Sequence, residues 1–170
     1  FALFRFMPRY SRPSWPEYFL TLAFIASSRS KDEETKHGCI ITDKNNIILG
    51  TGYNSPIRGI NDTLIPKTRP EKYPFFIHSE VNAIFNCRTL PKDCGGGRAY
   101  ITGKCCLNCL QSLIQVGVNE FYMAERQGSK LESEETNKDF NFIIANSGVQ
   151  VYYMEVKFDW LKEFLTNIKN

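Results

Sequence analysis

Ile77-His78-Ser79-Glu80-Val81 and, 26 residues after the glutamate, Cys106-Leu107-Asn108-Cys109 are the segments around which this chain is organised. One imidazole and two thiolates are zinc ligands, and three protein ligands leave the fourth tetrahedral position open to water. Zinc lowers the pKa of such a water towards ~7, so a nucleophile exists at neutral pH. We therefore predict a catalytic Zn²⁺ site with His78, Cys106 and Cys109 as the metal ligands.

Such a site also needs a carboxylate that is not a ligand, because protons must pass between water, substrate and leaving group. Glu80 follows His78 by two positions in the expected first turn of a helix. Its side chain should point away from the ligand direction and still stay near the metal. His-x-Glu followed by Cys-x-x-Cys is the signature of zinc-dependent nucleobase deaminases, in which the glutamate is the general acid and base. Glu80 is the predicted catalytic residue.

Each half of this pattern is weak by itself. A Cys-x-x-Cys pair could be a redox pair or half of a structural zinc site. A closed Cys2His2 site would need a second histidine at short spacing, and the only other histidine is His37, which precedes the first predicted strand. A structural or degenerate metal site stays open as the alternative.

The composition is that of a globular domain. The chain has 170 residues, 42% of them hydrophobic, which is enough for one core. We predict a single domain over residues 14–170, with residues 1–13 as an N-terminal extension. The net charge of +3 is too small to indicate a nucleic-acid partner. No apolar run reaches membrane-spanning length. The cysteine usage favours a reducing, intracellular and cytoplasmic location.

Local patterns predict alternating helices and strands. Ser14-Trp15-Pro16-Glu17 is a capping box that begins a helix ending near residues 27–30. One further helix should begin at His78 and another at Cys106. A third should end at Asn146, and a fourth should cover residues 158–168. Strands are expected at 38–42, 47–53, 98–102, 120–123 and 149–153, with a long irregular insert at 54–76. The predicted fold is an α/β class, three-layer α/β/α sandwich around a mixed five-stranded sheet.

Two details accompany this prediction. Gly50 and Gly52 lie within the second strand and indicate backbone crowding or a bulge there. The helix that begins at His78 should pack through Val81, Ile84 and Phe85.

Three further stretches resemble the deoxycytidylate (dCMP) deaminases of the cytidine deaminase superfamily. They are Trp15-Pro16-Glu17-Tyr18-Phe19 with Arg29-Ser30-Lys31-Asp32, Gly52-Tyr53-Asn54, and Lys72-Tyr73-Pro74 before the helix of His78. The resemblance implies zinc-dependent hydrolysis of dCMP to dUMP and ammonia. It also implies that Asn54 binds the sugar and that Arg29, with Lys31, binds the 5′-phosphate. The alternatives are a solvated helix end for Arg29 and Lys31 and a turn role for Asn54.

The same resemblance implies a homo-oligomer, a dimer or a hexamer, and regulation by dCTP and dTTP, with Mg²⁺ as a companion of the effector. Three positions depart from the family pattern. Cys105 replaces a proline and could compete as a zinc ligand, Ser55 replaces a glycine of the segment linked to regulation, and no tyrosine occurs at 125–128. Two other functions therefore stay open. One is a deaminase of another cytosine nucleotide, a free base or a nucleic-acid base, and the other is a catalytically silent nucleotide-sensing or assembly subunit.

Overall fold

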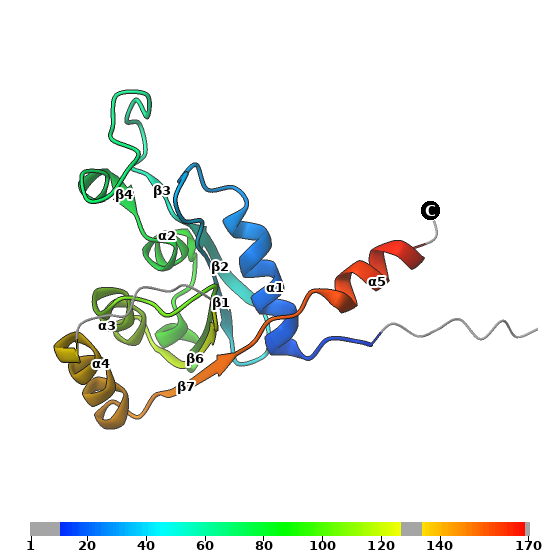
Figure 1. The fold of residues 1–170 in the computed structure, drawn as a ribbon. Coiled ribbons are helices and arrows are strands. Elements are labelled where there is room, and N and C mark those ends of the chain that lie inside the picture. Colours follow the sequence, from blue (N-terminus) through cyan, green and yellow to red (C-terminus); the bar gives the residue numbers. More distant parts are fainter. Residues whose placement is uncertain (1–10, 127–133, 169–170) are drawn as a thin grey trace, which may run out of the picture.

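A mixed five-stranded sheet forms the centre of the computed structural model, which describes residues 11–126 and 134–168 (Figure 1). The strands are β1 (Gly38–Asp43), β2 (Ile48–Tyr53), β5 (Gly97–Ile101), β6 (Val118–Ala124) and β7 (Gln150–Met154). Their order is β2-β1-β5-β6-β7. β1 is antiparallel to both of its neighbours, whereas β5, β6 and β7 are parallel. The predicted mixed five-stranded sheet is confirmed.

Helices cover both faces of this sheet. α1 (Trp15–Ser27) lies on one face, while α2 (Ser79–Asn86), α3 (Leu107–Gln115) and α4 (Glu134–Asn146) lie on the other (Figure 1). Successive side chains of one strand point to opposite faces of the sheet. Ile40 packs with Phe19 of α1, and Ile41 packs with Leu110 of α3. The three-layer sandwich is therefore confirmed.

α1 begins where the capping box predicts. Ser14 Oγ accepts a hydrogen bond from the Glu17 backbone N–H, and Glu17 Oε2 accepts one from the Ser14 N–H at 2.8 Å. The helix ends at Ser27, within the predicted region. Most of the predicted extension before it, residues 1–10, lies outside the described residues.

The glycines of β2 let α2 approach the sheet closely. A Cβ atom at Gly52 would lie 2.2 Å from the Ser79 backbone oxygen, and one at Gly50 would lie 2.4 Å from that of Ala83. The predicted crowding is therefore confirmed, and it holds the start of α2 in place.

The prediction for Phe85 is wrong, because its side chain is 75% exposed. α2 presents Ala83 to the sheet, and Phe85 lies about 200° around the helix from that contact.

The insert at 54–76 is held by a buried ion pair. The insert contains β3 (Ser55–Pro56) and the 3₁₀ helix η1 (Tyr73–Phe75). It runs into β4 (Phe76–Ile77), which pairs with β3. A second 3₁₀ helix, η2 (Pro91–Cys94), lies outside the insert and follows α2. Lys72 Nζ lies 2.8 Å from Asp32 Oδ2, with the two side chains 3% and 5% exposed, and 2.7 Å from a Glu34 oxygen. These contacts fasten the end of the insert to the loop before β1.

α5 (Asp159–Asn167) has no buried residue and extends away from the sandwich (Figure 1). It corresponds to the predicted helix at 158–168. Within the described residues, no helix is both long enough and apolar enough to cross a membrane.

Candidate metal centre and active site

Two helix N-termini bring the three predicted ligands together. His78 is the N-cap of α2, Cys106 is the N-cap of α3, and Cys109 lies in the first turn of α3. His78 Nδ1 lies 3.6 Å from Cys106 Sγ and 3.4 Å from Cys109 Sγ, and the three ligand atoms lie within 4.8 Å of one another.

These separations fit a shared zinc ion. With Zn–S near ~2.3 Å and Zn–N near ~2.0 Å, tetrahedral angles put sulfur and nitrogen roughly 3.5 Å apart. Residues three apart on a helix share a face, so both cysteines can point at one ion. A hydrogen bond from Cys109, followed by one from His78, lowers the pKa of the Cys106 thiol. The group can therefore supply a thiolate, which is the form that binds metal.

Glu80 is buried beside these ligands, with an exposed fraction of 6%. Burial raises the pKa of its carboxyl, and hydrogen bonds that include one from Ser79 oppose this rise. Ser79 Oγ donates to Glu80 Oε2 at 2.9 Å from a fully buried position. A carboxyl with a raised pKa can accept a proton and return it, as a general acid and base must.

Cys105 lies in the hydrophobic core rather than in the ligand group. Its side chain is 1% exposed and belongs to the core cluster between the sheet and α2, α3 and α4. Among the described residues, the group of neighbouring metal-ligating atoms consists of His78, Cys106 and Cys109. This placement favours Cys106 over Cys105 as the ligand.

Asn54 is buried, and its amide bonds to the loop before β1. Its Oδ1 accepts a hydrogen bond from the His37 N–H at 2.8 Å, and its Nδ2 donates to Thr35 O and to Asp32 Oδ2. Both amide hydrogens are therefore used within the protein. The capacity that remains is one lone pair on Oδ1. The sugar contact stays a prediction, and the geometry adds a role for Asn54 in shaping this loop.

Arg29 and Lys31 line a different pocket, of about 590 Å³, between the insert and α2. Its other lining residues include Ser55, Arg58 and Asn82, but none of the metal-ligating residues or Glu80. Lys31 Nζ also pairs with Asp62 at 2.5 Å. The phosphate role of these two cations stays a prediction.

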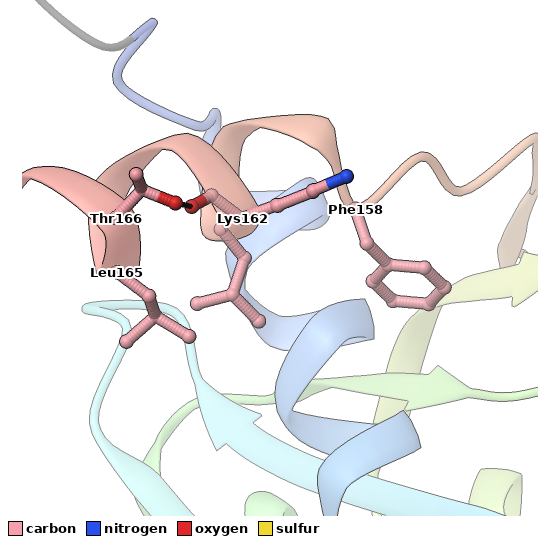
Figure 2. Close-up of a pocket in the computed structure, with 5 residues that line it drawn as sticks. Phe158, Lys162, Leu165 and Thr166 are labelled. Atoms are coloured by element: carbon pink, nitrogen blue, oxygen red, sulfur yellow. Dashed lines mark hydrogen bonds between the residues drawn. The ribbon is translucent and has the colours of Figure 1, made fainter.

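A second hollow, of about 450 Å³, lies along α5 (Figure 2). It is lined by Phe158, Leu161, Lys162, Leu165 and Thr166, all from the end of the chain. It contains no member of the catalytic group.

The sequence does not predict His37, Thr102 and Arg126 as part of the site. His37 lies directly before β1, Thr102 directly after β5, and Arg126 two residues after β6. Their side chains contact one another at this edge of the sheet, where His37 Nδ1 lies 3.3 Å from Thr102 Oγ1 and from Arg126 Nη1. A signal did exist, because residues at the carboxyl ends of parallel strands commonly line α/β sites.

A triad of metal-ligating side chains with a buried carboxyl beside it is the arrangement of a hydrolytic zinc site. The chain belongs to the cytidine and deoxycytidylate deaminase family, since the sequence model of that family's zinc-binding region matches residues 13–125.

Known relatives agree with this assignment. The deoxycytidylate deaminase of Mus musculus is 36% identical over 129 residues, which cover 72% of this chain and 70% of the relative. That of Homo sapiens is 34% identical over 134 residues, covering 75% and 74%. The crystal structure of dCMP deaminase from the cyanophage S-TIM5, in complex with dCMP and dUMP, is 25% identical and has a TM-score of 0.62. The alignment covers 85% of this chain and 99% of that one.

Proposed function

We propose that this chain catalyses the hydrolysis of dCMP to dUMP and ammonia within one domain over residues 14–170. The observation that carries the proposal is the meeting of His78, Cys106 and Cys109 beside the buried carboxyl of Glu80. The relatives named deoxycytidylate deaminase, and the similar structure in complex with dCMP and dUMP, support the same substrate.

The proposed roles follow from the chemistry of each group. His78, Cys106 and Cys109 would hold Zn²⁺, which supplies activation of a water molecule when it is bound. Glu80 would accept a proton from the attacking water while the water oxygen bonds to C4 of the cytosine ring, and it would pass this proton to N3. The second water proton leaves with the amino group as ammonia, again through Glu80. Ser79 holds the carboxyl in position during these transfers.

Ammonia release tests this function. The purified, zinc-loaded protein is assayed with dCMP, dCTP, deoxycytidine and cytosine, and zinc content is measured on the same sample. We expect turnover of dCMP far above that of the other three compounds. If the protein binds stoichiometric zinc but releases no ammonia from any of the four compounds, the proposal is contradicted and a nucleotide-sensing subunit is favoured.

We also propose a homo-oligomer with dCTP and dTTP as effectors. The pocket of Arg29, Lys31 and Arg58 supports an effector with several phosphates, because three cations line it. Mg²⁺ as a companion of the effector gains no support from the described residues. The same assay with added dCTP or dTTP tests regulation, and sedimentation tests assembly. None of the six cysteines forms a disulfide bond, which supports the proposal of an intracellular, cytoplasmic location.

A further inference from the structure

Arg126 and His37 form a contact that none of the proposed catalytic roles uses. Arg126 Nη1 donates to the Lys36 backbone oxygen at 3.1 Å and lies 3.3 Å from His37 Nδ1. A guanidinium can only donate, so Nδ1 must be the acceptor and the imidazole carries its proton on Nε2. Thr102 Oγ1, 3.3 Å away, lies against the same acceptor nitrogen.

His37 is therefore a neutral imidazole whose remaining donor is its Nε2–H. Burial, followed by the charges of Arg126 and His78, lowers the pKa of His37 to about 4. Its Nε2–H makes no hydrogen bond to the described residues, so none of them competes with a ligand for this donor.

Arg126 differs from the other partly buried arginines of the described chain. Arg69 lies 3.5 Å from a Glu34 carboxylate oxygen and Arg98 lies 2.6 Å from one of Glu120, whereas no carboxylate of the described residues pairs with Arg126. Its Nε and Nη2 groups have no protein acceptor among those residues. The Phe24 ring lies 5.9 Å from its guanidinium carbon, within the range of a cation–π contact. A half-buried cation with spare donors fits an anion that comes from outside the chain.

The pair also lies at a suitable distance from the ligand group. A Cβ atom at Gly103 would lie 3.4 Å from Arg126 Cδ and 3.6 Å from His37 Cε1. Gly103 precedes Cys106 by three residues, which span at most about 10 Å. The pair therefore lies within one short segment of chain from the ligand group, as the phosphate subsite of a nucleotide bound there requires.

We propose that Arg126 and His37 form the subsite for the 5′-phosphate of the substrate nucleotide. Arg126 binds the phosphate through Nε and Nη2, and His37 donates its Nε2–H to a phosphate oxygen. This inference rests on the proposed function, and it assigns the phosphate to a site different from the pocket of Arg29 and Lys31.

Equilibrium binding to the zinc-loaded protein tests the inference apart from turnover. Calorimetry compares dUMP with deoxyuridine, which differ only in the phosphate. We expect Arg126→Gln to weaken dUMP binding by about tenfold to a hundredfold, the range for hydrogen bonds to a charged group, and to weaken deoxyuridine binding by much less. Arg126→Lys keeps the charge and should restore part of the loss.

His37 has its own pair of variants. His37→Phe keeps a ring but removes the donor, and it should weaken dUMP binding by about threefold to tenfold. His37→Gln places an amide N–H near the Nε2 position and should retain most of the affinity. Equal losses for dUMP and deoxyuridine in His37→Phe would assign this residue to the base or sugar and overturn its phosphate role.

Arg29→Gln is the rival variant, and Arg88→Gln, on an exposed residue, is the neutral control. Melting temperature and zinc content exclude unfolding as the cause of a loss. The inference is overturned if Arg29→Gln loses the preference for dUMP while Arg126→Gln keeps it, or if the unmodified protein binds both compounds equally. Turnover of dCMP with no effect of Arg126→Gln would refute the inference alone. If the unmodified protein does not turn over dCMP but Arg126→Gln loses the preference for dUMP over deoxyuridine, the catalytic proposal is refuted and the phosphate subsite stands.

Discussion

The candidate active site has two halves that are built in different ways. The metal half consists of His78, Glu80, Cys106 and Cys109, all within the first turns of two helices. The loop half consists of His37, Asn54, Thr102, Arg126 and the ion pair of Asp32 with Lys72. In the metal half, the starts of two helices place the side chains, with one hydrogen bond from the neighbouring Ser79 to Glu80. In the loop half, hydrogen bonds and charges between distant segments place them. Mutations in the metal half should therefore reduce turnover or zinc binding, whereas mutation of the ion pair in the loop half should reduce stability.

The largest expected effect is the loss of turnover in Glu80→Gln. The amide has nearly the same size as the carboxyl but cannot carry protons, so kcat should fall by about 10²- to 10⁴-fold. Zinc content and melting temperature should stay close to those of the unmodified protein. Glu125→Gln, on an exposed glutamate, is the control. If Glu80→Gln retained most of its kcat, the metal half would not contain the proton shuttle.

The next expected effect is the loss of metal in Cys106→Ala. Removal of one of three ligands from a group this compact should abolish stoichiometric zinc binding, which elemental analysis of the purified protein measures. Cys105→Ala is the matched control, because its neighbouring thiol lies in the core and should affect stability only. Loss of zinc in Cys105→Ala with retention in Cys106→Ala would exchange the two assignments.

The difference between the halves also explains what the sequence could predict. His78, Cys106 and Cys109 form a recognisable pattern because helix starts bring residues at fixed spacing to one place. Arg126 has no such pattern, since its meeting with His37 depends on the order of β1, β5 and β6 in the sheet. The sequence pattern predicts Arg29 for the phosphate, and in the structure Arg29 lines the pocket between the insert and α2.

Mutation of the ion pair in the loop half should lower the stability of the protein. Lys72→Met leaves the carboxylate of Asp32 buried without its cation, which should lower the free energy of unfolding by about 3–5 kcal/mol. Lys31→Met is the matched control, because it removes a similar ion pair whose lysine is 66% exposed, and it should cost about 1 kcal/mol or less. Chemical denaturation measures both. Equal costs for the two variants would show that the buried pair does not hold the loop half.

This effect of Lys72→Met should depend on pH in a definite direction. Burial of Asp32 opposes ionisation, but hydrogen bonds from Lys72 and from backbone N–H groups outweigh it, so the pKa is lowered from 3.8. A carboxyl with a lowered folded-state pKa contributes stability above its unfolded pKa and loses it as the pH falls through the folded pKa. The difference between the unmodified protein and Lys72→Met should therefore be full at neutral pH and shrink below pH 3.8. A difference that stays constant in acid would assign it to packing of the lysine stem.

The smallest expected effect returns to the metal half, in Ser79→Ala. Ser79 donates one hydrogen bond to Glu80, and a neutral donor of this kind contributes about 0.5–1.5 kcal/mol, so kcat should fall by roughly twofold to tenfold. Loss of the donor also removes an interaction that lowers the pKa of Glu80, so the acid limb of the kcat profile should move to higher pH. Ser112→Ala on α3, whose hydroxyl bonds only to its own helix, should change neither quantity. A normal rate with an unshifted profile in Ser79→Ala would mean that burial alone positions and tunes Glu80, and the metal half would then owe its geometry entirely to the helix starts.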